Sequence, residues 1–256
     1  MWVSKHKKTL YKLLAIAFWI FVWGALAAYF NSELILASPL KTLKTLGKII
    51  VTGEFWASLL YSCIRILAGF FGAVLLGVAF AGLASKFGLI KALLSPITSV
   101  IKATPVASFI ILAIIWFGSK NLAVFISFLM VFPVIYLNVL KGIESTDSGL
   151  LEMARVYRMP IKKRLLYIYL PEIMPFFISA CSVSLGLCWK SGIAAEVIGI
   201  TEGSIGEMLY EAKLYFETGE LLAWTAVIIA VSVLFEKLFM TVLRALASSL
   251  ERRFTR

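Results

Sequence analysis

Six long stretches of this chain consist almost entirely of apolar residues, and shorter polar segments separate them. They cover Leu13–Phe30, Leu59–Ala84, Ile97–Phe117, Leu122–Leu140, Ile173–Val197 and Leu221–Leu243. A helix rises about 1.5 Å per residue, so about 20 apolar residues cross a hydrocarbon core about 30 Å thick. The stretches are continuous rather than alternating, which favours helices over barrel strands. The pattern predicts an all-α membrane protein with six transmembrane helices.

The composition supports this interpretation. The chain has 256 residues, of which 61% are hydrophobic and 15% are charged. A soluble domain has about 45–50% apolar and about 25% charged residues, so a soluble enzyme or a secreted disulfide scaffold is excluded. The three cysteines lie in apolar stretches without metal-like spacing, and we expect neither a disulfide framework nor a metal site.

The distribution of positive charge predicts the orientation of the chain. The formal net charge is +11. If the N-terminus is cytoplasmic, most of the basic residues fall on the inner side, and the outer side holds only Lys41, Lys44, Lys48, Lys120 and Lys213. This is the positive-inside pattern, which predicts that both termini are cytoplasmic and makes a nucleic-acid partner unnecessary. The first stretch is longer than the core of a signal peptide, and we expect it to remain as a span.

The polar segments suggest two regions of the chain. Residues 1–54 hold the first helix and an outer amphipathic segment, in which Ser38-Pro39 precedes apolar residues at helical spacing. Residues 55–256 form a core of five spans with an inner loop at residues 141–171. Near the outer mouth this core carries a set of carboxylates: Glu196, Glu202, Glu207, Glu211, Glu217 and Glu220.

Polar residues inside the spans are candidates for lining a translocation pathway. Polar groups at membrane depth tend to face a cavity or a partner, and prolines there free backbone carbonyls. In the third and fifth spans the candidates are Thr104, Pro105, Ser108, Trp189, Lys190 and Glu196. Lys190 either meets an anionic group of the solute, or reaches the outer interface, or pairs with Glu196.

The second span has a small residue at every fourth position: Gly69, Ala73, Gly77 and Ala81. Small side chains let two helix backbones approach closely. The stripe predicts either a packing seam inside the bundle or a contact between two subunits.

The inner loop from Lys141 to Pro171 contains more apolar residues than a solvated loop needs. Ser145 or Asp147 is a suitable N-cap for a short helix, whose apolar contacts come from Leu150, Leu151, Ala154 and Val156. A partly apolar helix with charges of both signs on the cytoplasmic side indicates docking to a soluble protein.

This loop resembles the EAA loop of ATP-binding-cassette (ABC) importer permeases. The family pattern is Glu-Ala-Ala, a Gly four positions later, and Ile-x-Leu-Pro after nine further residues. This chain has Glu152-Met153-Ala154, then Arg158, then Ile168-Tyr169-Leu170-Pro171. Arg158 replaces a Gly that permits a sharp turn, which implies either an altered turn, shifted to Met159-Pro160, or a different fit to the ATPase.

The resemblance extends from about Phe55 to the C-terminus, and three stretches resemble the nitrate/sulfonate/taurine branch: Ser62–Ala73, Ala103–Gly118 and Ala194–Gly199. It implies the type I importer permease fold in a bacterial plasma (inner) membrane. The implied partners are a second permease subunit, expected as a homodimer, two cytoplasmic ATPase subunits that bind ATP and Mg, and an extracytoplasmic solute-binding protein. The implied ATPase-coupling residues are Glu152, Ala154, Arg155, Arg158, Leu170 and Pro171.

The chain has no motif for chemistry of its own. G-x-x-x-x-G-K-[ST], H-E-x-x-H and G-x-S-x-G are missing, and His6 is the only histidine. We therefore predict a permease subunit without its own cofactor, which imports a small solute, most simply an anion such as a sulfonate or a nitrate-like compound. The alternative is an autonomous six-helix channel or an ion-coupled secondary transporter, which predicts ionisable pairs in several spans or an internal repeat.

Overall fold

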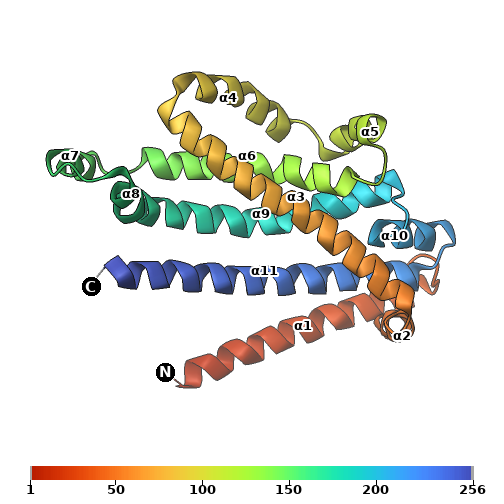
Figure 1. The fold of residues 1–256 in the computed structure, drawn as a ribbon. Coiled ribbons are helices and arrows are strands. Elements are labelled where there is room, and N and C mark those ends of the chain that lie inside the picture. The colour runs from red at the N-terminus through yellow and green to blue at the C-terminus, as the bar shows by residue number, and fades with distance from the viewer. Residues whose placement is uncertain (1, 255–256) are drawn as a thin grey trace.

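The computed structural model describes residues 2–254, with side chains described for residues 10–249, and every regular element in this range is helical (Figure 1). The long helices are α1 (Trp2–Phe30), α3 (Gly53–Lys86), α6 (Leu122–Glu144), α9 (Leu170–Gly199) and α11 (Thr218–Phe254). All five are long and apolar enough to cross a membrane. The predicted all-helical membrane fold is confirmed.

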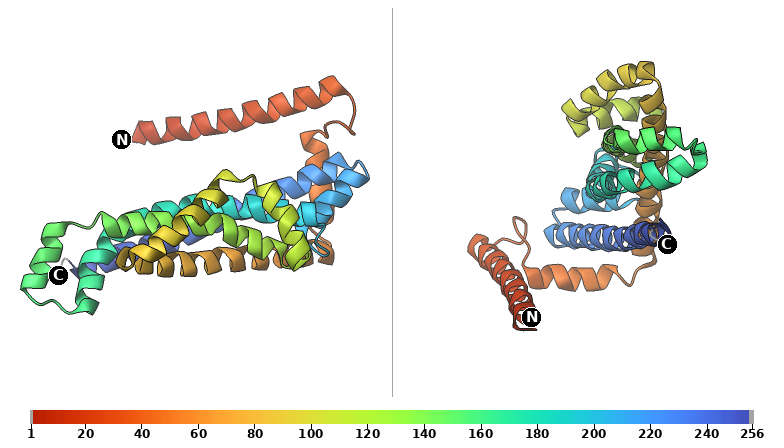
Figure 2. Two further views of the ribbon diagram at one scale, coloured as in Figure 1. Left: turned by 90° about the horizontal axis from the view of Figure 1, so that it is seen from above. Right: turned by 90° about the vertical axis from the view of Figure 1, so that its left-hand side faces the viewer.

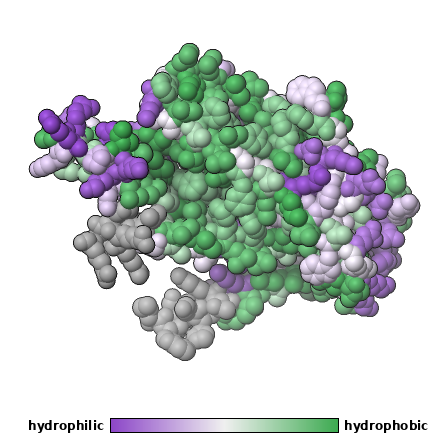
Figure 3. All heavy atoms as spheres, in the orientation of Figure 1, coloured by the Kyte–Doolittle hydropathy of each residue, from purple (hydrophilic) through white to green (hydrophobic). Residues whose placement is uncertain are grey.

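Shorter helices lie at the two ends of the bundle and along one side. They are α2 (Pro39–Ile49), α4 (Gly88–Ala103), α5 (Val106–Phe117), α7 (Ser148–Val156), α8 (Ile161–Arg164), the π-helical η1 (Leu165–Tyr169) and α10 (Ile205–Leu214). Helices α7 and α8 lie at one end of the bundle, and α2 and α10 lie at the other (Figure 1). The start of α1 and the end of α11 are at the α7 end (Figures 1 and 2). Figure 3 shows an apolar band over the helix shafts, with hydrophilic residues at both ends.

The third predicted span, Ile97–Phe117, is sharply bent and is not one continuous helix. Helices α4 and α5 meet at 110°, and the break falls at Thr104-Pro105. Proline has no amide hydrogen and disfavours helical backbone at the preceding residue, and Thr104 is extended, with φ −84° and ψ 134°. Within the described residues there are five continuous candidate spans, or six if this bent pair counts as one.

The stripe of small residues on α3 is a packing seam inside the chain. Its four members are buried. A Cβ on Gly69 would lie 2.4 Å from the backbone oxygen of Val124, and one on Gly77 would lie 2.9 Å from Cγ2 of Ile135. Both neighbours belong to α6, so the absence of side chains brings the two backbones together.

Helix α1 is scarcely covered by the rest of the chain. Only 6% of its apolar window is buried, and Figure 2 shows it standing away from the bundle. The Nε1 of Trp23 donates a hydrogen bond to the backbone oxygen of Ala37 at 3.0 Å, which ties α1 to the segment before α2.

Candidate functional site

The loop between α6 and α9 contains a short helix, as the sequence predicts. Asp147 is the N-cap of α7, because its Oδ1 accepts a hydrogen bond from the backbone N–H of Gly149 at 2.6 Å. Ser145, the other candidate, ends α6 instead, and its Oγ donates to the backbone oxygen of Lys141 at 2.8 Å. The linker from α6 to α7 is therefore only a few residues long, which limits how far α7 can move without α6.

Arg158 makes the turn that ends α7. Its φ is 50°, in the left-handed region where an L-residue is disfavoured and glycine is not. The N–H of Met159 donates to the oxygen of Ala154 at 2.8 Å, and the N–H of Arg158 donates to the oxygen of Arg155 at 3.0 Å. These bonds form the usual left-handed helix ending. The turn is therefore at the position of the family glycine and is not shifted to Met159-Pro160.

The exposed surface of α7 has charged and apolar parts. Glu152 and Arg155 are exposed and form no ion pair within the described part of the chain, whereas Ala154 is buried. Met153 is 46% exposed and Val156 is 78% exposed. A helix this short is marginal alone in water, so a surface of this kind is suited to packing against a partner.

The second half of the coupling motif lies at the root of the loop. Leu170 and Pro171 are half-buried in the first turn of α9, directly after the π-helical turn η1. The predicted coupling residues thus fall into two groups. One group lies on α7 and its final turn, and the other, Leu170 and Pro171, lies in the first turn of α9. Along the chain, α8 and η1 connect the first group to the second.

The pathway candidates on the third and fifth spans lie on two helices that pack together. Thr104 and Pro105 form the break before α5, and Ser108 lies in the first turn of α5. Helix α5 contacts α9 through an apolar cluster that includes Ile110 and Ala195. No hydrogen bond joins the candidates on α5 to those on α9 among the described side chains.

Trp189 and Lys190 point to different surroundings. Trp189 is 2% exposed and belongs to the main core of the bundle, whereas Lys190 is exposed. Lys190 makes no ion pair with Glu196 in the part of the chain that the structure describes, so that alternative for Lys190 is wrong.

Glu196 is fully buried between α3, α9 and α10. Its Oε2 accepts a hydrogen bond from Ser62 Oγ at 2.7 Å and from the N–H of Gly206 at 3.4 Å. Ser62 Oγ also accepts from the N–H of Ile205 at 2.9 Å. The carboxylate thus holds the start of α10 against α3, and Ser62 is a partner that sequence reasoning missed. No local pattern marks it, since it is one serine in an apolar stretch.

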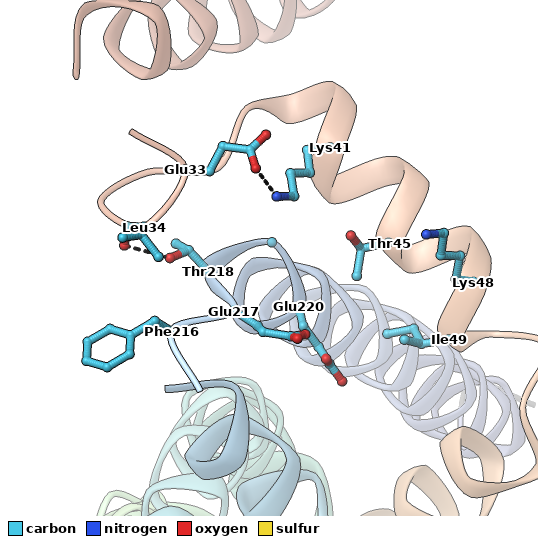
Figure 4. A pocket seen from close by; sticks show the side chains of 11 residues that line it. Glu33, Leu34, Lys41, Thr45, Lys48, Ile49, Phe216, Glu217, Thr218 and Glu220 are labelled. Atoms are coloured by element: carbon cyan, nitrogen blue, oxygen red, sulfur yellow. Dashed lines mark hydrogen bonds and ion pairs between the residues drawn. The ribbon is translucent and has the colours of Figure 1, made fainter. Parts of the chain in front are cut away.

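The α10 end holds a cavity of about 410 Å³ between α2 and the turn that leads into α11 (Figure 4). Lys41 pairs with Glu33, and Thr218 Oγ1 donates to the backbone oxygen of Leu34 at 2.8 Å. Phe216, with φ 58°, is 70% exposed and points away from this cavity. Glu217, the next residue after Phe216, is exposed, in agreement with the predicted acidic outer surface.

The sequence pattern of the binding-protein-dependent transport system inner membrane component family matches residues 73–256. The chain belongs to this family. It is therefore a permease subunit of an ABC importer, a multi-pass protein of the bacterial plasma membrane that is not itself an enzyme, because the ATPase is a separate subunit. The interpretation as an autonomous channel or secondary transporter is set aside.

Relatives place the chain in the branch that its sequence resembles. SsuC of Bacillus subtilis, provisionally named an aliphatic sulfonates transport permease protein, is 28% identical over 75% of this chain and 70% of its own. The taurine transport system permease protein TauC of Escherichia coli is 26% identical over 84% of this chain and 80% of its own. The bicarbonate transport system permease protein CmpB of Synechococcus elongatus is 26% identical over 62% of this chain and 58% of its own.

The fold is also that of a solved ABC transporter. A crystal structure of an amino acid ABC transporter with histidines matches with a TM-score of 0.57 and 20% identity, over 81% of this chain and 97% of that one. At this identity the likeness shows the fold, the permease architecture, alone.

Proposed function

We propose that two copies of this chain form the pathway by which a small anion enters the cell. The anion comes from an extracytoplasmic binding protein, and two cytoplasmic ATPase subunits, which hold ATP and Mg, drive its passage. The similarity to permeases named for sulfonates, taurine and bicarbonate supports an anionic solute. The chain itself needs no cofactor, since the free energy of ATP reaches it as movement of α7.

The exposed surface of α7 is the observation that carries this proposal. Its charged Glu152 and Arg155 and its uncovered Val156 form a compact docking element at the α7 end, which we expect to face the cytoplasm. Closure of the ATPase dimer displaces this element, and α6 and α9 transmit the displacement to the bundle. Changing the ratio of the inward-open to the outward-open state of the bundle from 99:1 to 1:99 takes about 5.5 kcal/mol. The ATP-bound ATPase must therefore favour one of these states by that amount.

The coupling role is tested by Glu152→Ala in the assembled importer. We expect weaker co-purification of the ATPase subunit and reduced ATP-dependent uptake, with membrane insertion unchanged. Glu202→Ala is the matched control for co-purification of the ATPase, because Glu202 is an exposed glutamate at the opposite end of the bundle. Normal co-purification and normal uptake in the Glu152 variant would remove α7 from the coupling contact.

Lys190 is the proposed cation of the pathway. It is exposed on α9, and α5, whose N-terminal break holds Thr104 and Pro105, packs against the same helix. Lys190→Met should raise the KM or lower the rate of uptake of an organic sulfonate, because the positive charge that meets the anion is lost. Lys12→Met, on the exposed surface of α1 away from α5 and α9, is the control. Unchanged uptake kinetics in the Lys190 variant would exclude this role.

The binding protein is expected to dock at the α10 end. Glu211 and Glu217 are exposed there beside Tyr215 and Phe216, which are 71% and 70% exposed. Exposed aromatic residues flanked by carboxylates suit a partner with basic patches. Charge reversal by Glu211→Lys should weaken stimulation of the importer by the binding protein, and an effect that does not depend on ionic strength would argue against an electrostatic contact.

A further inference from the structure

A second cavity, of about 520 Å³, lies at the α7 end where α3, α6 and the start of the α8–η1 segment meet. Its polar lining includes Lys86, Glu144 and Arg164, and its walls are apolar, with Leu83 and Ile173 among them. Neither the family match nor the coupling and pathway proposals give this cavity a role.

The charges in the cavity are not balanced. Glu144 forms an ion pair with Lys91 of α4, so its charge is neutralised by a residue outside the lining. Lys86 and Arg164 form no ion pair within the described part of the chain. Two cations from different helices therefore line one space without a paired anion, because the one carboxylate of the lining is bound to Lys91, and an anionic ligand would complete this arrangement.

The position of the cavity selects the kind of anion. Lys86 is the last residue of α3 and Glu144 is the last residue of α6, so the cavity lies where the apolar shafts give way to polar residues. Beyond these residues, toward the bilayer centre, the lining is apolar. A basic pocket between membrane helices at headgroup depth, continuous with an apolar wall, suits a phospholipid better than a free soluble anion.

We propose that this cavity binds the headgroup of an anionic phospholipid. The phosphate lies between Lys86 and Arg164, and the adjoining acyl chain follows the apolar wall formed by Leu83 and Ile173. Because Lys86 belongs to α3 and Arg164 to α8, the bound lipid joins the root of the α7 loop to the bundle.

The local backbone is consistent with a binding role. The segment Leu165–Tyr169 is a π-helix, and both its first and its last residue line the cavity. A π-helical turn is rare and is found frequently at functional sites. Lipid bound here would influence how motion of α7 passes through η1 into α9, so we expect the transport rate to depend on the anionic lipid content of the membrane.

The test measures binding of phosphatidylglycerol to the purified full-length permease, in nanodiscs of phosphatidylcholine with increasing phosphatidylglycerol and by native mass spectrometry. The double variant Lys86→Gln/Arg164→Gln should bind about 30-fold more weakly, since each cation near a membrane surface contributes a separate attraction to the anionic lipid. The matched control is Lys162→Gln/Lys163→Gln, which removes two exposed charges from the same short helix α8 outside the lining and should bind nearly as the wild type does.

A second variant fills the cavity without changing any charge. Gly82 lines the cavity and a Cβ there has no atom within 4 Å, so Gly82→Leu adds an apolar side chain at the cavity wall. Loss of phosphatidylglycerol binding in this variant supports the proposal and does not depend on how the charge variants fold.

Three results would overturn it. Retention of full lipid binding by Gly82→Leu would place the lipid elsewhere. Equal weakening in the Lys162/Lys163 control would show general surface attraction. Displacement of the lipid by millimolar inorganic phosphate would identify a soluble anion as the occupant.

Discussion

Replacement of Arg158 by glycine isolates the backbone strain in the turn that ends α7. With a φ of 50°, Arg158 is in the left-handed region, which costs an L-residue about 1–2 kcal/mol. Glycine removes this cost but gives the unfolded chain more freedom, which offsets about 0.5–1 kcal/mol. The folded turn is therefore stabilised by a net free energy of about 0.5–1 kcal/mol, which makes local opening of the turn about 2–5 times rarer.

Hydrogen exchange at Met159 measures this change directly. Its N–H is bonded to the oxygen of Ala154 at 2.8 Å, so it exchanges only when the turn opens. We expect its exchange to slow about 2–5-fold in Arg158→Gly. Arg158→Ala is the control, because it removes the charge but keeps the Cβ and hence the strain, and it should not slow exchange.

Two outcomes would refute this reasoning. Equal slowing in the glycine and alanine variants would assign the effect to the loss of charge. Unchanged exchange in Arg158→Gly would mean that the turn carries no left-handed strain. If the turn becomes more stable while ATPase binding weakens, the arginine side chain itself contacts the motor, and the strain is tolerated for that contact.

Two further predictions concern the bundle. Gly69→Ala should lower the free energy of unfolding in detergent by about 1–3 kcal/mol, because the new Cβ would lie 2.4 Å from a backbone oxygen of α6. Gly72→Ala on the same helix should be tolerated, since its Cβ meets only an ordinary contact at 3.7 Å. Equal melting temperatures of the two variants would contradict the packing seam. Ser62→Ala should lower the free energy of unfolding by about 1–3 kcal/mol, because it leaves the carboxylate of Glu196 and the N–H of Ile205 without the hydroxyl that both contact. A melting temperature equal to that of the wild type would mean that water replaces this hydroxyl.

The sequence pattern predicts the spans where the rules are local. Apolar stretches long enough to cross the bilayer became α1, α3, α6, α9 and α11, because in lipid a helix satisfies its own backbone groups. The third stretch became a bent pair of helices, because Thr104-Pro105 breaks the helix and composition alone does not show that break. A hydropathy average over the stretch does not detect such a break. The rule that disfavours helical backbone before proline is also local, and it does mark this position.

The short helix in the loop between α6 and α9 was predictable for the same reason, and the buried contacts were not. The cap of α7 by Asp147 spans two residues, whereas the bond between Ser62 and Glu196 joins positions 134 apart. Likewise, Lys86 and Arg164 share a cavity only because α3 and α8 meet in space. Pairings of this kind depend on how the helices pack, which a single sequence does not encode locally.

Cross-linking from α7 tests the central claim most directly. A cysteine introduced by Val156→Cys is at a position 78% exposed on α7, while the native Cys181 and Cys188 are buried and Cys63 is half-buried in the bundle. In an importer assembled from this chain, its ATPase and its binding protein, the account predicts a cross-link from position 156 to the ATPase subunit whose yield changes when ATP is added. A complex that transports solute but gives no such cross-link would contradict it.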